Sequence, residues 1–105
     1  MSRLLGFKQW LELNETMDKY GEWGRAGLLT KKIFTQTDAD NILIGVNDIL
    51  FDEKKLQDFD NRVDVRLQKD GRARIMYPIS VVTGKHKKFQ DLYKKVIKKV
   101  LGKIK

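Results

Sequence analysis

The chain of 105 residues is predicted to form one small α+β domain. Two patterns support this prediction. Alternating apolar residues flank an Asp-Gly pair between residues 63 and 81, which is typical of a β-hairpin, and apolar residues recur every three or four positions between residues 89 and 104, which is typical of a helix. The expected elements are an N-terminal helix, an antiparallel β-hairpin or sheet, and a C-terminal amphipathic, lysine-rich helix. The length suffices for one modest core.

The N-terminal segment is expected to begin with a short amphipathic helix that Ser2 can cap. Its apolar face would hold Leu4, Leu5, Phe7, Trp10, Leu11 and Leu13. Lys8, Gln9 and Glu12 interrupt the apolar run, so we expect neither a secretory signal nor a membrane span. The alternative is an ordinary N-terminal helix that packs on the domain through Phe7, Trp10, Leu11 and Met17.

The segment from residue 20 to residue 55 gives weaker signals. Glycines at 21, 24 and 27 in YGEWGRAG indicate a flexible connector, because no Lys-Ser or Lys-Thr follows to complete a phosphate-binding loop. DADNILIGVNDILFDEKK, residues 38–55, fits either strands around Gly45 with an Asn47-Asp48 turn, or a helix capped by Asp38 or Asp40. We favour the strands.

A β-hairpin is predicted for RVDVRLQKDGRARIMYPISVV, residues 62–82. The apolar positions that alternate along its two strands are Val63, Val65 and Leu67, then Ala73, Ile75, Tyr77, Ile79 and Val81. A three-residue loop, 69–71, pairs Leu67 with Ala73 and Val65 with Ile75, so that all apolar residues share one face. Gly71 is then expected in the left-handed conformation.

The polar face of this hairpin carries arginines. The same register places Arg66 opposite Arg74, a like-charge pair that needs Asp64 or an anionic partner nearby. Pro78 lacks an N–H group, so we expect it either on a sheet edge or where the strand stops pairing.

KHKKFQDLYKKVIKKVLGKIK, residues 85–105, is predicted to be an amphipathic helix that Thr83 or Gly84 can begin. Its apolar stripe consists of Phe89, Leu92, Tyr93, Val96, Ile97, Val100, Leu101 and Ile104. Nine lysines against Asp91 give this segment a net charge of +8, which equals the charge of the whole chain. Residues 1–84 are therefore neutral, with 13 basic and 13 acidic residues.

The residue types argue against an enzyme. The chain has no cysteine, and its one histidine, His86, lies in a run of lysines, so neither a Cys-His nor a Ser-His nucleophile is expected. The scattered aspartates and glutamates could serve a magnesium-dependent nuclease, but helix caps, turns and surface charge account for most of them. We predict no catalytic residue, metal site or cofactor.

The cationic residues indicate binding to the phosphate backbone of nucleic acid or to an acidic protein surface. The candidate contacts are Lys87, Lys88, Lys94, Lys95, Lys98, Lys99 and Lys103 on the helix, with Arg66, Arg72 and Arg74 on the hairpin. A core-packing helix with a solvated lysine face is the structural alternative.

Leu13-Asn14-Glu15, followed by Thr16, completes the N-terminal segment MSRLLGFKQWLELNE. This segment resembles the leaders of internal head proteins of T-even-type bacteriophages, in which a prohead protease cuts after the glutamate of a Leu- or Ile-x-Glu sequence. The resemblance implies recognition of Leu13 and Glu15 and a cut before Thr16. Residues 1–15 would then be a cleavable capsid-targeting leader, and 16–105 the mature α+β domain with its basic helix at 85–105.

The same resemblance implies a function and a location. Such proteins are packaged and injected with the genome, so this protein would act without catalysis, by binding DNA or a host defence enzyme, first in the virion interior and then in the host cytoplasm. Two alternatives remain from the residues themselves. One is a cytoplasmic protein that binds nucleic acid independently of sequence, and the other is a small inhibitor or subunit that docks on an acidic protein surface.

Overall fold

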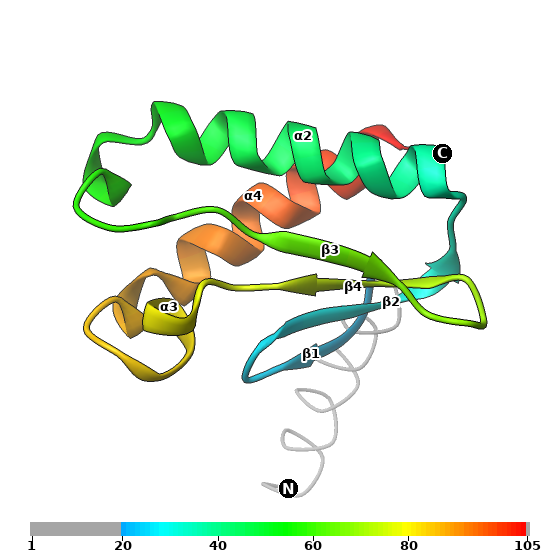
Figure 1. Cartoon of the computed structure of the whole chain (residues 1–105), viewed down its shortest axis with the longest axis horizontal. Helices are drawn as coiled ribbons and strands as arrows, with labels where there is room; N and C mark the ends of the chain where they lie inside the picture. Colours follow the sequence, from blue (N-terminus) through cyan, green and yellow to red (C-terminus); the bar gives the residue numbers. More distant parts are fainter. Residues whose placement is uncertain (1–19, 105) are drawn as a thin grey trace, which may run out of the picture.

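The computed structural model describes residues 20–104, which form an α+β domain, as predicted (Figure 1). The strands belong to one antiparallel sheet of order β1-β2-β4-β3. In chain order the elements are β1 (Gly21–Gly24), β2 (Gly27–Ile33), α2 (Gln36–Asp52), a 3-10 turn η1 (Lys54–Leu56), β3 (Asp64–Leu67), β4 (Arg72–Met76), α3 (Ile79–Thr83), a 3-10 turn η2 (Lys87–Phe89) and α4 (Gln90–Lys103). The predicted N-terminal helix lies outside the described residues.

The register predicted for the β3–β4 hairpin is confirmed. Leu67 pairs with Ala73, Val65 with Ile75 and Arg66 with Arg74. Gly71 closes the three-residue loop with a φ of 89°, in the left-handed region. A side chain there would also be crowded, because a Cβ would lie 2.6 Å from Cγ2 of Ile33.

β4 stops at Met76, and its pairing ends at Pro78. This confirms one of the two expectations for this proline, that the strand stops pairing there. The predicted strand continues through Ile79 and Val81, and this part of the prediction is wrong. Both the Val81 and the Val82 N–H groups donate to the Pro78 carbonyl, at 2.9 and 3.2 Å, and so begin the short helix α3. Val81 is buried, whereas Ile79 is 83% exposed.

The interpretation of residues 20–27 as a flexible connector is wrong, because they form most of the β1–β2 hairpin. Trp23 pairs with Leu28 and Gly24 with Gly27 around the two-residue turn Arg25-Ala26. Gly27 has a φ of 145°, and a Cβ there would collide with the Ile75 carbonyl of β4. This glycine therefore allows the turn to reach the neighbouring strand, where the Tyr77 N–H donates to the Ala26 carbonyl at 2.8 Å.

Residues 36–52 form helix α2, so the strands favoured for this segment are wrong and the helical alternative holds. Its cap is Thr35, so the predicted cap at Asp38 or Asp40 is wrong. The Thr35 hydroxyl accepts from the Asp38 N–H at 3.1 Å while the Asp38 carboxylate accepts from the Thr35 N–H at 3.3 Å. This reciprocal pair satisfies two N–H groups that a helix leaves unpaired at its start. The residues that α2 buries are Ala39, Ile42, Val46 and Leu50.

One hydrophobic core joins the sheet to the helices. The sheet contributes Leu28, Ala73 and Ile75, and the helices contribute residues of α2 and α4 that are buried against them. Figure 1 shows α2 running beside β3 while α4 crosses one face of the sheet, and α2 contacts both β3 and α4. The position of α4 on that face decides which basic residues can act together.

Candidate nucleic-acid interface

The apolar stripe predicted for the C-terminal helix packs into the core. Tyr93, Val96, Ile97, Val100 and Leu101 are buried. Phe89, Leu92 and Ile104 are partly buried against the same core. The lysines therefore occupy the remaining arc of α4.

α4 begins at Gln90, later than the predicted start at Thr83 or Gly84. Gly84 has an extended backbone that ends α3 instead of starting a new helix. His86 then stacks on Phe59 with ring centroids 3.7 Å apart, which holds the connecting turn against the domain. The basic segment predicted as one helix over 85–105 is thus a loop, the turn η2 and α4 within its described part.

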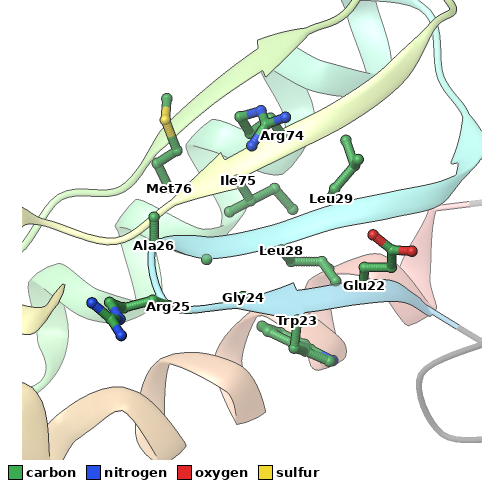
Figure 2. A pocket seen from close by; sticks show the side chains of 11 residues that line it. Glu22, Trp23, Gly24, Arg25, Ala26, Leu28, Leu29, Arg74, Ile75 and Met76 are labelled. Carbon is green, nitrogen blue, oxygen red and sulfur yellow. The ribbon is translucent and has the colours of Figure 1, made fainter. Parts of the chain in front are cut away.

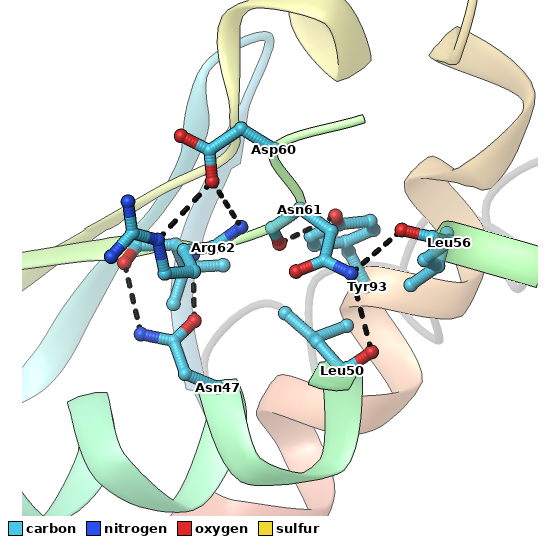
Figure 3. A network of polar contacts seen from close by, with 8 residues as sticks. Asn47, Leu50, Leu56, Asp60, Asn61, Arg62 and Tyr93 are labelled. Atoms are coloured by element: carbon cyan, nitrogen blue, oxygen red, sulfur yellow. Dashed lines mark hydrogen bonds and ion pairs between the residues drawn. The ribbon is translucent and has the colours of Figure 1, made fainter. Parts of the chain in front are cut away.

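A hydrogen-bond network fixes α4 relative to α2 (Figure 3). The Tyr93 hydroxyl donates to the Asn61 carbonyl at 2.7 Å, and the Asn61 side chain donates to the Leu56 and Leu50 carbonyls at 2.7 and 3.4 Å. Burial raises the pKa of the Tyr93 hydroxyl well above its usual range, so this group keeps the proton that it donates. These hydrogen bonds connect the buried side of α4, through Asn61, to the end of α2.

The α4 lysines fall into two groups. Lys95, Lys99 and Lys103 are exposed, as are Lys87 and Lys88 of the preceding turn. Lys94 and Lys98 are partly buried and lie toward β1. The Lys94 Nζ is 5.7 Å from the centre of the Trp23 ring, and the Lys98 Nζ is 5.9 Å from the same ring and 5.7 Å from the Tyr20 ring.

Within residues 20–104, every ion pair joins an arginine to the aspartate two positions before it. The pairs are Asp60–Arg62 at 3.2 Å, Asp64–Arg66 at 2.9 Å and Asp70–Arg72 at 2.9 Å. The backbone N–H and the guanidinium of Arg72 both bond the Asp70 carboxylate and lower its pKa. No lysine takes part in an ion pair with the described residues, so the lysine charges are available to an anionic partner.

The hairpin arginines lie on the sheet face opposite α4. Arg72 and Arg74 alternate along β4 with Ala73 and Ile75, which are buried toward the helices, and Arg66 is the cross-strand neighbour of Arg74. Asp64 lies beside Arg66, as the like-charge pair required. The structure therefore does not bring the ten candidate basic residues together: the sheet separates Arg66, Arg72 and Arg74 from the lysines of α4.

A hollow of about 460 Å³ lies over β1, β2 and β4 (Figure 2). Leu29, Arg74 and Met76 line it on the face away from α4, and Gly24 and Gly27 line it beside the β1–β2 turn. In the same view Trp23 points to the other side of β1, toward α4. None of the α4 lysines lines the hollow.

Sequence reasoning missed Trp23 as a neighbour of the lysine face. Part of this placement could have been predicted, because the alternation of residues in a hairpin with a two-residue turn puts Trp23, Leu28 and Thr30 on one face. The contact with Lys94 and Lys98 joins the first strand to the last helix, and no local pattern predicts such a pairing. The predicted cleavage residues Leu13, Glu15 and Thr16 lie outside the described residues.

The part of the chain that the structure describes holds no group of three or more His, Cys, Asp or Glu side chains arranged to bind a metal ion. None of its helices is both long and apolar enough to cross a membrane. The chain matches no protein-family model, no curated protein and no solved structure.

Proposed function

We propose that this protein binds nucleic acid through the phosphate backbone, using the lysines on the exposed arc of α4. One observation carries the proposal: α4 has five lysines and one aspartate, a net charge of +4, and no lysine is neutralised by an acidic partner among residues 20–104. A cluster of cations on one helix face attracts phosphates and releases their bound counterions.

This binding should be independent of base sequence. A lysine ammonium is a point charge on a flexible stem, whereas base recognition in the major groove usually depends on planar, bidentate groups such as arginine. The hairpin arginines that could supply such groups lie on the opposite face, and Arg66 and Arg72 are already paired with aspartates. The lysine face therefore supports affinity for phosphates without sequence readout.

The direct test removes lysines from α4 and, separately, the same charge from elsewhere. Lys95→Gln with Lys99→Gln should weaken binding to labelled duplex DNA in a fluorescence anisotropy titration. Lys54→Gln with Lys55→Gln is the matched control, because both of these lysines are exposed in η1. Equal losses in the two variants would show that only net charge matters and would remove α4 from the proposal.

We further propose that the protein is an internal head protein of a T-even-type bacteriophage, packaged and injected with the genome. The support is the Leu13-Asn14-Glu15 tripeptide together with the cationic helix at the other end of the chain. Residues 20–104 contain the sheet, the helices and a hydrophobic core, and a cut between Glu15 and Thr16 would leave this part of the chain covalently intact. After injection the protein would act without catalysis, by binding DNA or a host defence enzyme.

Processing is testable by itself. Purified prohead protease should convert the chain to a product that begins at Thr16, as N-terminal sequencing or mass spectrometry would show. Glu15→Ala should block this conversion, while Glu12→Ala, which removes the same charge from the same segment, should leave it unchanged. Recovery of uncut chains from mature particles would contradict the packaging proposal and leave the nucleic-acid proposal standing.

A further inference from the structure

Trp23 lies where the edge of the sheet meets the lysine face of α4. β1 is the outer strand beside β2, and its Trp23 side chain is partly exposed on the α4 side. The ammonium groups of Lys94 and Lys98 lie 5.7 and 5.9 Å from the centre of its ring. These two lysines are one helical turn apart, about 6 Å along the axis of α4. The Trp23 ring and two ammonium groups therefore converge at this boundary, where the Tyr20 ring also lies 5.7 Å from the Lys98 ammonium group.

A ring flanked by cations suits single-stranded nucleic acid. An unpaired base can stack on an indole while the neighbouring phosphates contact ammonium groups, and each stacked base adds affinity without regard to its identity. In a duplex each base already stacks on its neighbours, so an indole on the protein surface adds little to the affinity. The same lysines would serve both forms, but the ring would serve only the single strand.

The contacts in the free protein are compatible with this exchange. A lysine above an aromatic ring is held by cation–π attraction, which is weak at a partly exposed site. Its four-carbon stem allows the ammonium group to move toward a phosphate. That movement would uncover the ring for a base, and the charge–ring contact would be replaced by a charge–phosphate contact and a stacked base.

We propose that Trp23, Lys94 and Lys98 form a stacking site for single-stranded nucleic acid at the junction of β1 and α4. The inference rests on the proposed function, because the α4 lysines supply its phosphate contacts. It adds a preference that phosphate binding alone does not give: at equal length and salt, the protein binds a single strand more tightly than phosphate contacts to α4 would predict.

The test uses the full chain with Trp10→Phe, which leaves Trp23 as the single tryptophan of the two in the sequence. Oligo(dT) should quench Trp23 fluorescence on binding, and a duplex of the same length should leave it nearly unchanged. Trp23→Leu should weaken oligo(dT) binding by roughly 5- to 100-fold, as expected for one stacked base, with the duplex affinity unchanged. Trp23→Phe, which keeps a ring, should lose much less.

The outcomes separate the two proposals. Binding of oligo(dT) without quenching, or equal losses for both nucleic acids in Trp23→Leu, would overturn the stacking site and leave phosphate binding by α4 intact. Failure of the unmutated protein to bind either form at low salt would overturn the proposed function and, with it, the stacking site. If Trp23→Leu does not fold by circular dichroism, the quenching measurement and the Trp23→Phe variant decide the question.

Discussion

The two long helices of the domain pack against each other, but their solvent-facing surfaces differ in charge and in composition. α2 carries four aspartates and no basic residue, whereas α4 carries five lysines and one aspartate. α2 also exposes two large apolar side chains, Ile44 at 58% and Phe51 at 74%, while the outer arc of α4 carries mainly lysines. Burial of apolar side chains positions both helices, so the difference between them lies in what their outer faces can bind. Of the two helices, only α4 has an outer face with the positive charge that attracts an anion.

The largest expected effect separates buried from exposed positions on the two helices. Ile97→Ala in α4 removes a fully buried side chain and should lower the free energy of unfolding by about 2–5 kcal/mol. Ile44→Ala in α2 makes the same chemical change at an exposed site and should stay within about 0.5 kcal/mol. Urea denaturation followed by circular dichroism measures both. Similar losses of unfolding free energy in the two variants would mean that Ile44 is buried in solution.

A smaller effect is expected from the hydrogen bonds between α2 and the residue that precedes β3. The Asn47 side chain accepts from the Val63 N–H at 2.8 Å and donates to the Val63 carbonyl at 3.3 Å. Asn47→Ala leaves both groups without these partners and should cost about 1–3 kcal/mol in the same unfolding assay. Asn41→Ala, at an exposed position of the same helix, is the control. A stable Asn47→Ala protein would show that water replaces the amide at little cost.

The smallest effect concerns how the two helices begin. Thr35 caps α2 through its side chain, whereas Phe89 precedes α4 without any side-chain cap bond. Thr35→Ala should therefore destabilise the domain by about 0.5–2 kcal/mol, and Thr37→Ala, inside the first turn, by less. If the two threonine variants lost equal stability, helix propensity rather than capping would explain the effect.

The sequence was sufficient to predict a basic amphipathic helix in the last part of the chain and the register of the β3–β4 hairpin, because these patterns are local. It was not sufficient to predict the start of α4 at Gln90 or the end of β4 at Met76. In α4 the lysines and the apolar residues segregate cleanly, so the helical period is visible. In the hairpin, the alternation of the apolar residues and the Asp70-Gly71 turn allow one register, and the cross-strand pair of Leu67 and Ala73 confirms it. Both elements fold as their own residues prefer.

Helix α2 was only the less favoured of two predictions for residues 38–55, because several of its deciding features are tertiary. Ile44 and Phe51 are apolar but exposed, so they blur the helical period, and Gly45 suggested an interruption. In the fold, Gly45 faces α4, and a Cβ there would lie 3.1 Å from Cγ1 of Val100. The glycine thus permits close packing between the helices, which no local propensity reveals.

The candidate site was predictable only in part. The lysines followed from composition and periodicity, and the placement of Arg66 and Arg74 on the outer hairpin face followed from the register. The separation of these arginines from the lysines could also have been deduced, since the apolar stripe of α4 must pack on the apolar face of the hairpin. The contact of Trp23 with Lys94 and Lys98 could not, because it depends on where β1 joins the sheet.

The central claim, that the lysine face of α4 binds phosphates, is tested most directly by the salt dependence of binding. Each phosphate contact on duplex DNA contributes about −0.9 to the slope of log K against log salt concentration. Neutral substitution of Lys94, Lys95, Lys98 and Lys99 by glutamine should flatten that slope by about 3–4, while the buried stripe preserves the fold by circular dichroism. An unchanged slope and affinity in the folded four-lysine variant would contradict the claim and leave the lysines of α4 as a solvated surface.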